Sequence, residues 1–274
     1  MTLKNILVAF TGSDPSITAL QVAKLMSEKY GCHITGVLAH GLPNVVYSYG
    51  SHLPQNTVDQ INEADTVHRS EVRAKFDAVV KGMPADKVHF IEIYGDADDK
   101  LMQVAHSFDL IVMGPSDVNS GFQHMEVHPD TVARNSGRPV LVVPADYNPA
   151  NFNDHALIAW DGRRAAGRAL ADAMTIFPNN AKMTVLTICR ADDAAEKTAS
   201  VMEHLSRHGI DANLIQRERK GKKVAKIIQD TAAESGAGLV VMGAYQHSKL
   251  AEDLFGGVTN KILATSKVPV LLSH

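Results

Sequence analysis

Short apolar runs alternate along the chain with longer segments in which apolar residues recur at helical spacing. The first pattern is typical of buried strands and the second of amphipathic helices. The expected strands are Asn5–Phe10, His33–Ala39, Val88–Tyr94, Leu110–Met113, Pro139–Val143, His155–Trp160, Met183–Ile188, Asp211–Gln216, Leu239–Met242 and Val268–Leu272. The expected helices are Ser16–Tyr30, Thr57–Gly82, Asp96–Ser107, Ala165–Phe177, Ala191–His208, Lys222–Ser235 and Val258–Ser266. This alternation favours an α/β fold with a parallel sheet covered on both faces.

The pattern of the first half recurs in the second. NILVAFTGS matches HALIAWDGR, FDLIVMGPS matches AGLVVMGAY, and GRPVLVVPA matches KVPVLLSH, at offsets of 150, 129 and 130 residues. We therefore predict a duplicated domain, with residues 1–146 and 153–274 as the two copies and Ala145–Asp154 as the linker. About twenty extra residues in the first half fall in HGLPNVVYSYGSHLPQ, expected to be a long loop, and in the charged helix after it.

The composition fits a globular chain, with 45% hydrophobic residues and a net charge of −3. This charge gives no general attraction to nucleic acid or to anionic membrane, and the apolar run at the N-terminus is too short for a membrane span. We expect a cytoplasmic protein. Cys32 and Cys189 lie far apart, and we expect both to be buried without a disulfide.

Several polar residues have a functional and a plainer interpretation. His40, His52, His124 and His128 show no metal-ligand spacing, so we expect solvated loop histidines. The basic run RERKGKK from Arg217 is short and is expected to form a solvated edge.

The stretch LVVMGAYQHSKLAEDLFGGVTN combines a strand end, a glycine-containing loop and a helix start. In a parallel sheet such a loop lies at the carboxyl end of a strand, and the N–H groups of the next helix attract phosphate. The glycines could instead punctuate the loop without binding anything, although Asp161 and the loop spacing favour a binding role.

Taken with the repeat, this pattern resembles the universal stress protein family in its tandem form. The resemblance implies two Rossmann-like, five-stranded parallel domains that form an intrachain pseudo-dimer, with ATP between the first and fourth strands of a domain. It also implies an aspartate against adenine and a glycine loop around the phosphates and ribose. Mg²⁺ with ATP and a homodimer of the tandem chain are further implications.

The second half keeps most of this pattern. The residues that match or flank the family's binding motif are Ala159, Trp160, Asp161, Ile188, Met242, Gly243, Gln246, His247, Gly256, Gly257, Val258 and Thr259. Gln246 replaces a glycine, so it adds bulk near the phosphate path, although its amide could donate to an oxygen. Asp161 could instead cap the following helix.

The first half has lost the pattern. Thr11 replaces the aspartate, Gly114 survives, and Asp117 takes the second glycine position, where its charge would repel phosphate. No catalytic motif is present, so we expect a binding protein rather than an enzyme. Three hypotheses stay open: a nucleotide-binding stress protein without rapid turnover, an interaction and dimerisation scaffold with vestigial pockets, and a slow ATPase.

Overall fold

The computed structural model describes residues 3–49, 52–117, 120–177, 181–190, 194–244 and 257–274. Its strands are β1 Asn5–Ala9, β2 His33–His40, β3 Val88–Tyr94, β4 Leu110–Met113, β5 Val140–Val142, β6 Ala156–Trp160, β7 Met183–Ile188, β8 Ala212–Arg217, β9 Leu239–Gly243 and β10 Val270–Ser273. Its α-helices are α1 Asp14–Tyr30, α2 Asn44–Tyr49, α3 Gln55–Val80, α4 Ala97–Ala105, α5 Pro129–Asn135, α6 Arg164–Ile176, α7 Ala194–Arg207, α8 Val224–Ser235 and α10 Val258–Thr265. Short 3-10 helices are η2 Ala85–Lys87, η3 Gln123–Met125 and η4 Pro149–Asn151.

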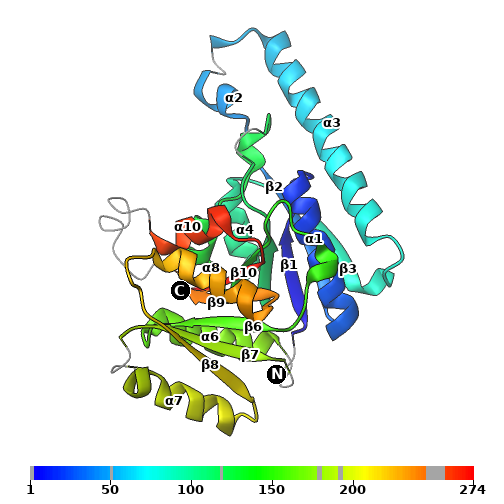
Figure 1. Ribbon diagram of the computed structural model, residues 1–274. Helices are drawn as coiled ribbons and strands as arrows, with labels where there is room; N and C mark the ends of the chain where they lie inside the picture. The colour runs from blue at the N-terminus through cyan, green and yellow to red at the C-terminus, as the bar shows by residue number, and fades with distance from the viewer. Residues whose placement is uncertain (1–2, 50–51, 118–119, 178–180, 191–193, 245–256) are drawn as a thin grey trace.

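The ten strands form one continuous sheet in the order β3-β2-β1-β4-β5-β10-β9-β6-β7-β8 (Figure 1). All described pairs within a half are parallel, and among the described strands the one antiparallel pair joins β5 to β10. Leu141 lies opposite Leu271 in this pair, which we call the seam. The predicted pseudo-dimer is confirmed, because the terminal strand of each half covers the exposed edge of the other.

Side chains alternate between the two faces of the sheet and build two cores that both cross the seam. On one face Ile6, Val8 and Leu141 pack with helices α1, α3, α6 and α7. On the other face Leu7, Val140 and Val142 pack with helices α4, α5, α8 and α10. The strands are buried on both sides, which is why they read as continuous apolar runs.

Two helices of the first half were absent from the predicted set. The segment expected to be a long loop contains α2, because the helical stretch NVVYSY lies between the Gly, Pro and Ser residues that made it look irregular. Helix α5 was missed because it is only 7 residues long, too short to display a helical period. The other elements agree with the sequence to within a few residues at their ends.

The linker is packed against the first half rather than extended between the halves. Tyr30, the last residue of α1, donates a hydrogen bond to the carboxylate of Asp154, which also accepts an ion pair from Lys29 at 2.5 Å. Tyr147 is buried in the core beside this region. The end of α1 therefore fixes the segment that leads into β6.

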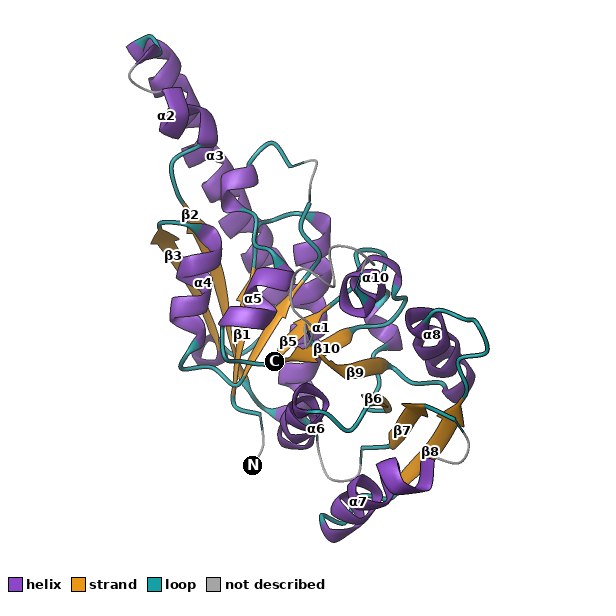
Figure 2. Cartoon of the chain, turned by 90° about the vertical axis from the view of Figure 1, so that its left-hand side faces the viewer, coloured by secondary structure: helices purple, strands orange, loops and turns teal. Residues whose placement is uncertain are grey.

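The extra residues of the first half form an arm, which we define as α2 and α3. Figures 1 and 2 show α2 and the first part of α3 projecting away from the sheet, whereas the last part of α3 lies against it. Val72 and Phe76 anchor that last part in the core, and Phe76 contacts Phe10 edge to face at 5.5 Å. The sequence predicted the helix but not its projection.

Cys32 is buried as expected, and both cysteines are free. Cys189 is partly exposed, so the prediction that it is buried was wrong: it follows the last residue of β7, where the strand leaves the core. Within the described ranges, no helix combines the length and apolar character needed to cross a membrane.

Candidate functional site

The crevice of the second half begins where β6 and β9 end. Ala159 on β6 lies opposite Met242 on β9, and Trp160 pairs with Thr187 on the neighbouring strand β7. Trp160 and Ile188 are partly exposed at this edge, whereas Met242 is buried. The structure therefore brings the strand-end residues predicted for the site to one edge of the sheet.

Asp161 and Gly162 form the turn from β6 to α6. The Oδ1 atom of Asp161 accepts a hydrogen bond of 3.0 Å from the N–H of Arg163, and Gly162 adopts a left-handed φ of 75° that favours glycine. The N-cap position of α6 belongs to Arg163, so Asp161 stabilises the turn before the helix instead of capping it. Asp161 is exposed, so its second carboxylate oxygen is accessible to a ligand.

Gly243 is required by helix packing. A Cβ on this residue would lie 2.6 Å from the main-chain carbon of Ala165 in α6. Gly114 occupies the same place in the first half, where a Cβ would lie 2.7 Å from Pro15 in α1. These two glycines let a helix approach the end of a strand, and they need no ligand to explain them.

The N-terminus of α10 begins at the same edge of the sheet. Its N-cap residue is Gly257, and its first turn contains no acidic residue. Thr259 has only 4% of its surface exposed, so its side chain belongs to the core and only its main-chain N–H could serve a ligand. Val258 is partly solvent-exposed. Gln246, His247 and Gly256 lie outside the described residues.

The equivalent crevice of the first half is nearly filled. A cavity of about 10 Å³, no larger than a water molecule, lies between the ends of β1 and β4. Thr11 Oγ1 lies 2.9 Å from Ser13 Oγ, so the turn here is held by two hydroxyl groups in place of a carboxylate. Glu126 lines the cavity with only 5% of its surface exposed, a residue that sequence reasoning missed.

A sequence profile of the universal stress protein family matches residues 2–144 and again residues 153–274. The chain belongs to the universal stress protein family. No curated protein sequence matches it.

Solved structures agree with the universal stress protein fold. A universal stress protein from Archaeoglobus fulgidus DSM 4304 is similar at 20% identity and a TM-score of 0.71, over 98% of this chain and 95% of that one. A functionally unknown protein from Pseudomonas aeruginosa PAO1 gives 16% identity and a TM-score of 0.56 over 99% and 92%. A putative universal stress protein from Pseudomonas aeruginosa UCBPP-PA14 gives 15% and 0.55 over 99% and 93%. At these identities the likeness shows the fold.

The histidines of this universal stress protein are not all solvated. His124 has a side chain only 8% exposed and lies 3.0 Å from the carboxylate of Asp65, and His40, with a side chain 14% exposed, lies 3.3 Å from Glu92. The expectation of solvated histidines was wrong for these two. Asp65 of α3 contacts His124, and Glu92, the partner of His40, is itself paired with Arg69 of α3. Burial lowers the pKa of His40. His128 is half exposed and paired with Asp98, and His52 is exposed.

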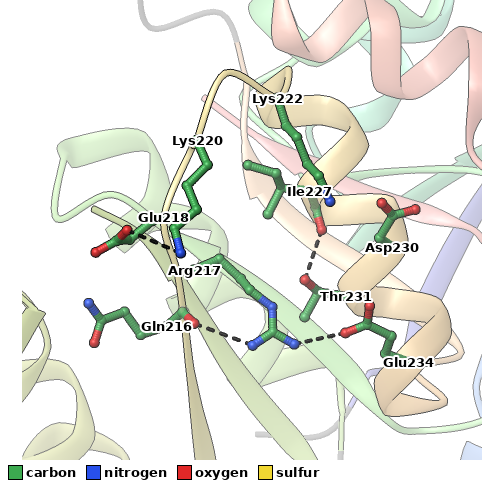
Figure 3. Close-up of a pocket in the computed structure, with 9 residues that line it drawn as sticks. All are labelled: Gln216, Arg217, Glu218, Lys220, Lys222, Ile227, Asp230, Thr231 and Glu234. Atoms are coloured by element: carbon green, nitrogen blue, oxygen red, sulfur yellow. Dashed lines mark hydrogen bonds and ion pairs between the residues drawn. The ribbon is translucent and has the colours of Figure 1, made fainter. Parts of the chain in front are cut away.

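The basic run forms the exposed edge that was predicted. It borders a groove of about 380 Å³ between the end of β8 and α8 (Figure 3). Arg217 pairs with Glu234 at 2.8 Å, and Lys220 pairs with Glu218 at 3.7 Å. Cations and anions alternate around the groove, so it presents no continuous positive surface.

No three His, Cys, Asp or Glu side chains cluster as metal ligands among the residues that the structure describes. The charged loop residues Lys249, Glu252 and Asp253 lie outside those residues.

Proposed function

We propose that this universal stress protein binds an adenine nucleotide in its second half and holds it without rapid turnover. The observation that carries the proposal is the contrast between the two crevices. In the second half an exposed aspartate, Asp161, stands at the strand end, and α10 starts on a glycine with no acidic residue in its first turn. In the first half a buried carboxylate, Glu126, occupies the crevice.

The residues of the second crevice suit the two ends of a nucleotide. A helix N-terminus carries partial positive charge and unsatisfied N–H groups, which favour phosphate oxygens. The carboxylate of Asp161 can accept a hydrogen bond from an adenine amino group while its other oxygen keeps the turn. The partly exposed Trp160 and Ile188 provide apolar surface beside it.

The experiment is direct. The purified protein is denatured, and the released small molecules are separated by chromatography and identified by mass. An adenine nucleotide in near-stoichiometric amount supports the proposal, and a protein that releases none and gives no heat in a calorimetric titration with ATP contradicts it. Adding and omitting Mg²⁺ in the titration tests whether ATP binds with the ion.

The other two hypotheses predict different results. A scaffold with vestigial pockets binds no nucleotide, and a homodimer of the tandem chain would appear at twice the monomer mass in light scattering. A slow ATPase binds ATP and releases ADP over many minutes. We also propose that the protein is cytoplasmic and that residues 1–146 and 153–274 form its two domains. Expression of each half alone tests these domain limits.

A further inference from the structure

Glu126 is a buried carboxylate, and among the described residues no salt bridge joins it to a basic side chain. Its Oε2 atom accepts a hydrogen bond of 3.2 Å from the main-chain N–H of Asp117, and its carboxylate is also hydrogen-bonded to Ser120. Burial raises the pKa of Glu126, because the charged form loses water. A buried anion is tolerated where hydrogen-bond donors surround it, and here a loop N–H supplies part of that environment.

Glu126 accepts a hydrogen bond from a main-chain N–H that corresponds to part of the phosphate loop. Asp117 takes the place of the second glycine of the phosphate loop, so its N–H is one of the donors that a phosphate would use. In the first half that donor is used by Glu126 instead. The offset of 129 residues makes Phe255, which carries no charge, the counterpart of Glu126 in the second half.

A second carboxylate blocks the N-terminus of α5. The main-chain N–H of His128, at the N-cap, donates a hydrogen bond of 2.7 Å to Asp98 Oδ1, and His128 Nδ1 lies 3.0 Å from Asp98 Oδ2. The first residue of the helix is Pro129, which has no N–H, whereas its counterpart is Val258. Asp130 adds a negative charge to the first turn of α5.

The arm holds this loop in place. Asp65 of α3 lies 3.0 Å from His124 Nε2 in η3, and the ring of His68 of α3 stacks on Phe122 with centroids 3.7 Å apart. Gln123 Nε2 ties the same loop to the carbonyl oxygen of Asp117 at 2.8 Å. The extra helix of the first half therefore contacts the segment immediately before Glu126.

We propose that Glu126 acts as a built-in anion in the first crevice, positioned by α3, and that it confines phosphate-bearing ligands to the second half. The inference extends the proposed function to the first half. Its first test needs no nucleotide, so it can fail or succeed independently of nucleotide binding.

The first test measures hydrogen exchange of the Asp117 amide by NMR in the full chain. Glu126→Ala removes the acceptor, and exchange should accelerate about tenfold, the equivalent of one charge-assisted hydrogen bond. Glu126→Gln keeps an acceptor and the side-chain shape, so it should retain part of the protection and guard against a variant that does not fold. Glu203→Gln on the exposed side of α7 is the matched control and should change nothing. Equal exchange rates in the wild type and Glu126→Ala would overturn the inference.

The arm is tested by Asp65→Ala, which releases His124. Hydrogen exchange of the Asp117 amide should then accelerate severalfold, although residue 126 is still glutamate. If Asp65→Ala leaves the Asp117 amide as protected as in the wild type, the positioning role of α3 is wrong.

The second test uses inorganic phosphate as the probe. Phosphate should shift the Asp117 amide resonance in Glu126→Gln and in the Glu126→Gln/Asp98→Asn double variant, and should leave it unmoved in the wild type and in Glu203→Gln. A shift in the wild type, or none in either variant, would overturn the assignment of Glu126 as the excluding group. Resonances of Thr259, followed in a separate ATP titration, report on the second half, so failure there counts against the proposed function alone.

Discussion

The hydroxyl group of Tyr30 donates a hydrogen bond to the carboxylate of Asp154, although 124 residues separate them in the sequence. Tyr30 ends a helix of the first half, and Asp154 lies two residues before the first strand of the second. Lys29 pairs with the same carboxylate. This contact joins the halves at a point away from the seam.

Loss of the Tyr30 hydroxyl should therefore destabilise the protein. Tyr30→Phe removes one hydrogen bond to a charged group and should lower the free energy of unfolding by about 1–2 kcal/mol in urea denaturation. Tyr147→Phe is the control, because the buried hydroxyl of Tyr147 has no hydrogen-bond partner within the described parts of the chain. That variant should be neutral or more stable. Equal destabilisation by both would show that the loss comes from removing a hydroxyl group and not from its hydrogen bond to Asp154.

The same contact predicts a dependence on pH. Burial, together with the hydrogen bond to Asp154 and its charge, raises the pKa of Tyr30 above the ordinary value of 10.0. The unfolded chain loses the proton first, so the stabilisation is complete below pH 10 and declines as the pH rises beyond it. The difference in unfolding free energy between the wild type and Tyr30→Phe should shrink between pH 9 and pH 11 (about one unit either side of that ordinary value). A constant difference would contradict this.

Gly114 and Gly243 should both be intolerant of alanine, because a helix packs closely against each of them. Gly114→Ala and Gly243→Ala each place a methyl group within 2.7 Å of helix backbone, which should cost about 1–3 kcal/mol in unfolding free energy. Gly167→Ala lies inside α6, and no described atom beyond its own stretch of helix comes within 4 Å of the new methyl group, so this variant should instead be neutral or gain about 0.5–1 kcal/mol. A tolerant Gly243→Ala would indicate that the strand end yields.

The affinity of the second-half crevice for nucleotide should respond to changes in that half only. Asp161→Ala and Gly256→Val should each weaken ATP binding about tenfold or more in calorimetry, the valine because it is β-branched within the phosphate loop. Asp161→Asn keeps an acceptor for the Arg163 N–H, so it separates ligand contact from turn stability. Asp117→Ala should change little. Equal losses from Asp117→Ala and Asp161→Ala would remove the asymmetry.

We expect the protein to hydrolyse ATP too slowly for ATP hydrolysis to be its biological function. Rapid phosphoryl transfer needs a positioned nucleophile and cations that offset developing charge. The test is steady-state hydrolysis by a preparation checked for contaminating ATPases. A rate near the enzyme median of about 10 per second, abolished by Glu252→Ala or Asp253→Ala, would instead establish an enzyme.

The architecture was readable from the sequence because its determinants are local. Strands buried on both faces give runs such as LIVM at Leu110–Met113, and the duplicated runs at Val140–Val142 and Val270–Ser273 indicated which strands would meet. Composition misled only where a short helix, α2, lay among glycines and prolines.

The state of the first crevice was not readable, because it depends on contacts between distant residues. The sequence placed a carboxylate there but pointed to Asp117, whereas the buried carboxylate is that of Glu126. His124 looked like a loop histidine because its partner Asp65 is 59 residues away on the arm. A regular spacing reveals residues that share one element, but not residues that a tertiary contact brings together.

The antiparallel seam also determines where the two crevices lie relative to each other. Ligand crevices lie at the carboxyl ends of parallel strands. Since β5 and β10 run oppositely, the two crevices open toward opposite margins of the sheet. The arm stands with the first crevice, so a partner docked on the arm and a nucleotide in the second half would be on opposite sides of the molecule. Energetic coupling between the two sites would therefore pass through the interior, where Leu141 lies opposite Leu271, and not across the surface.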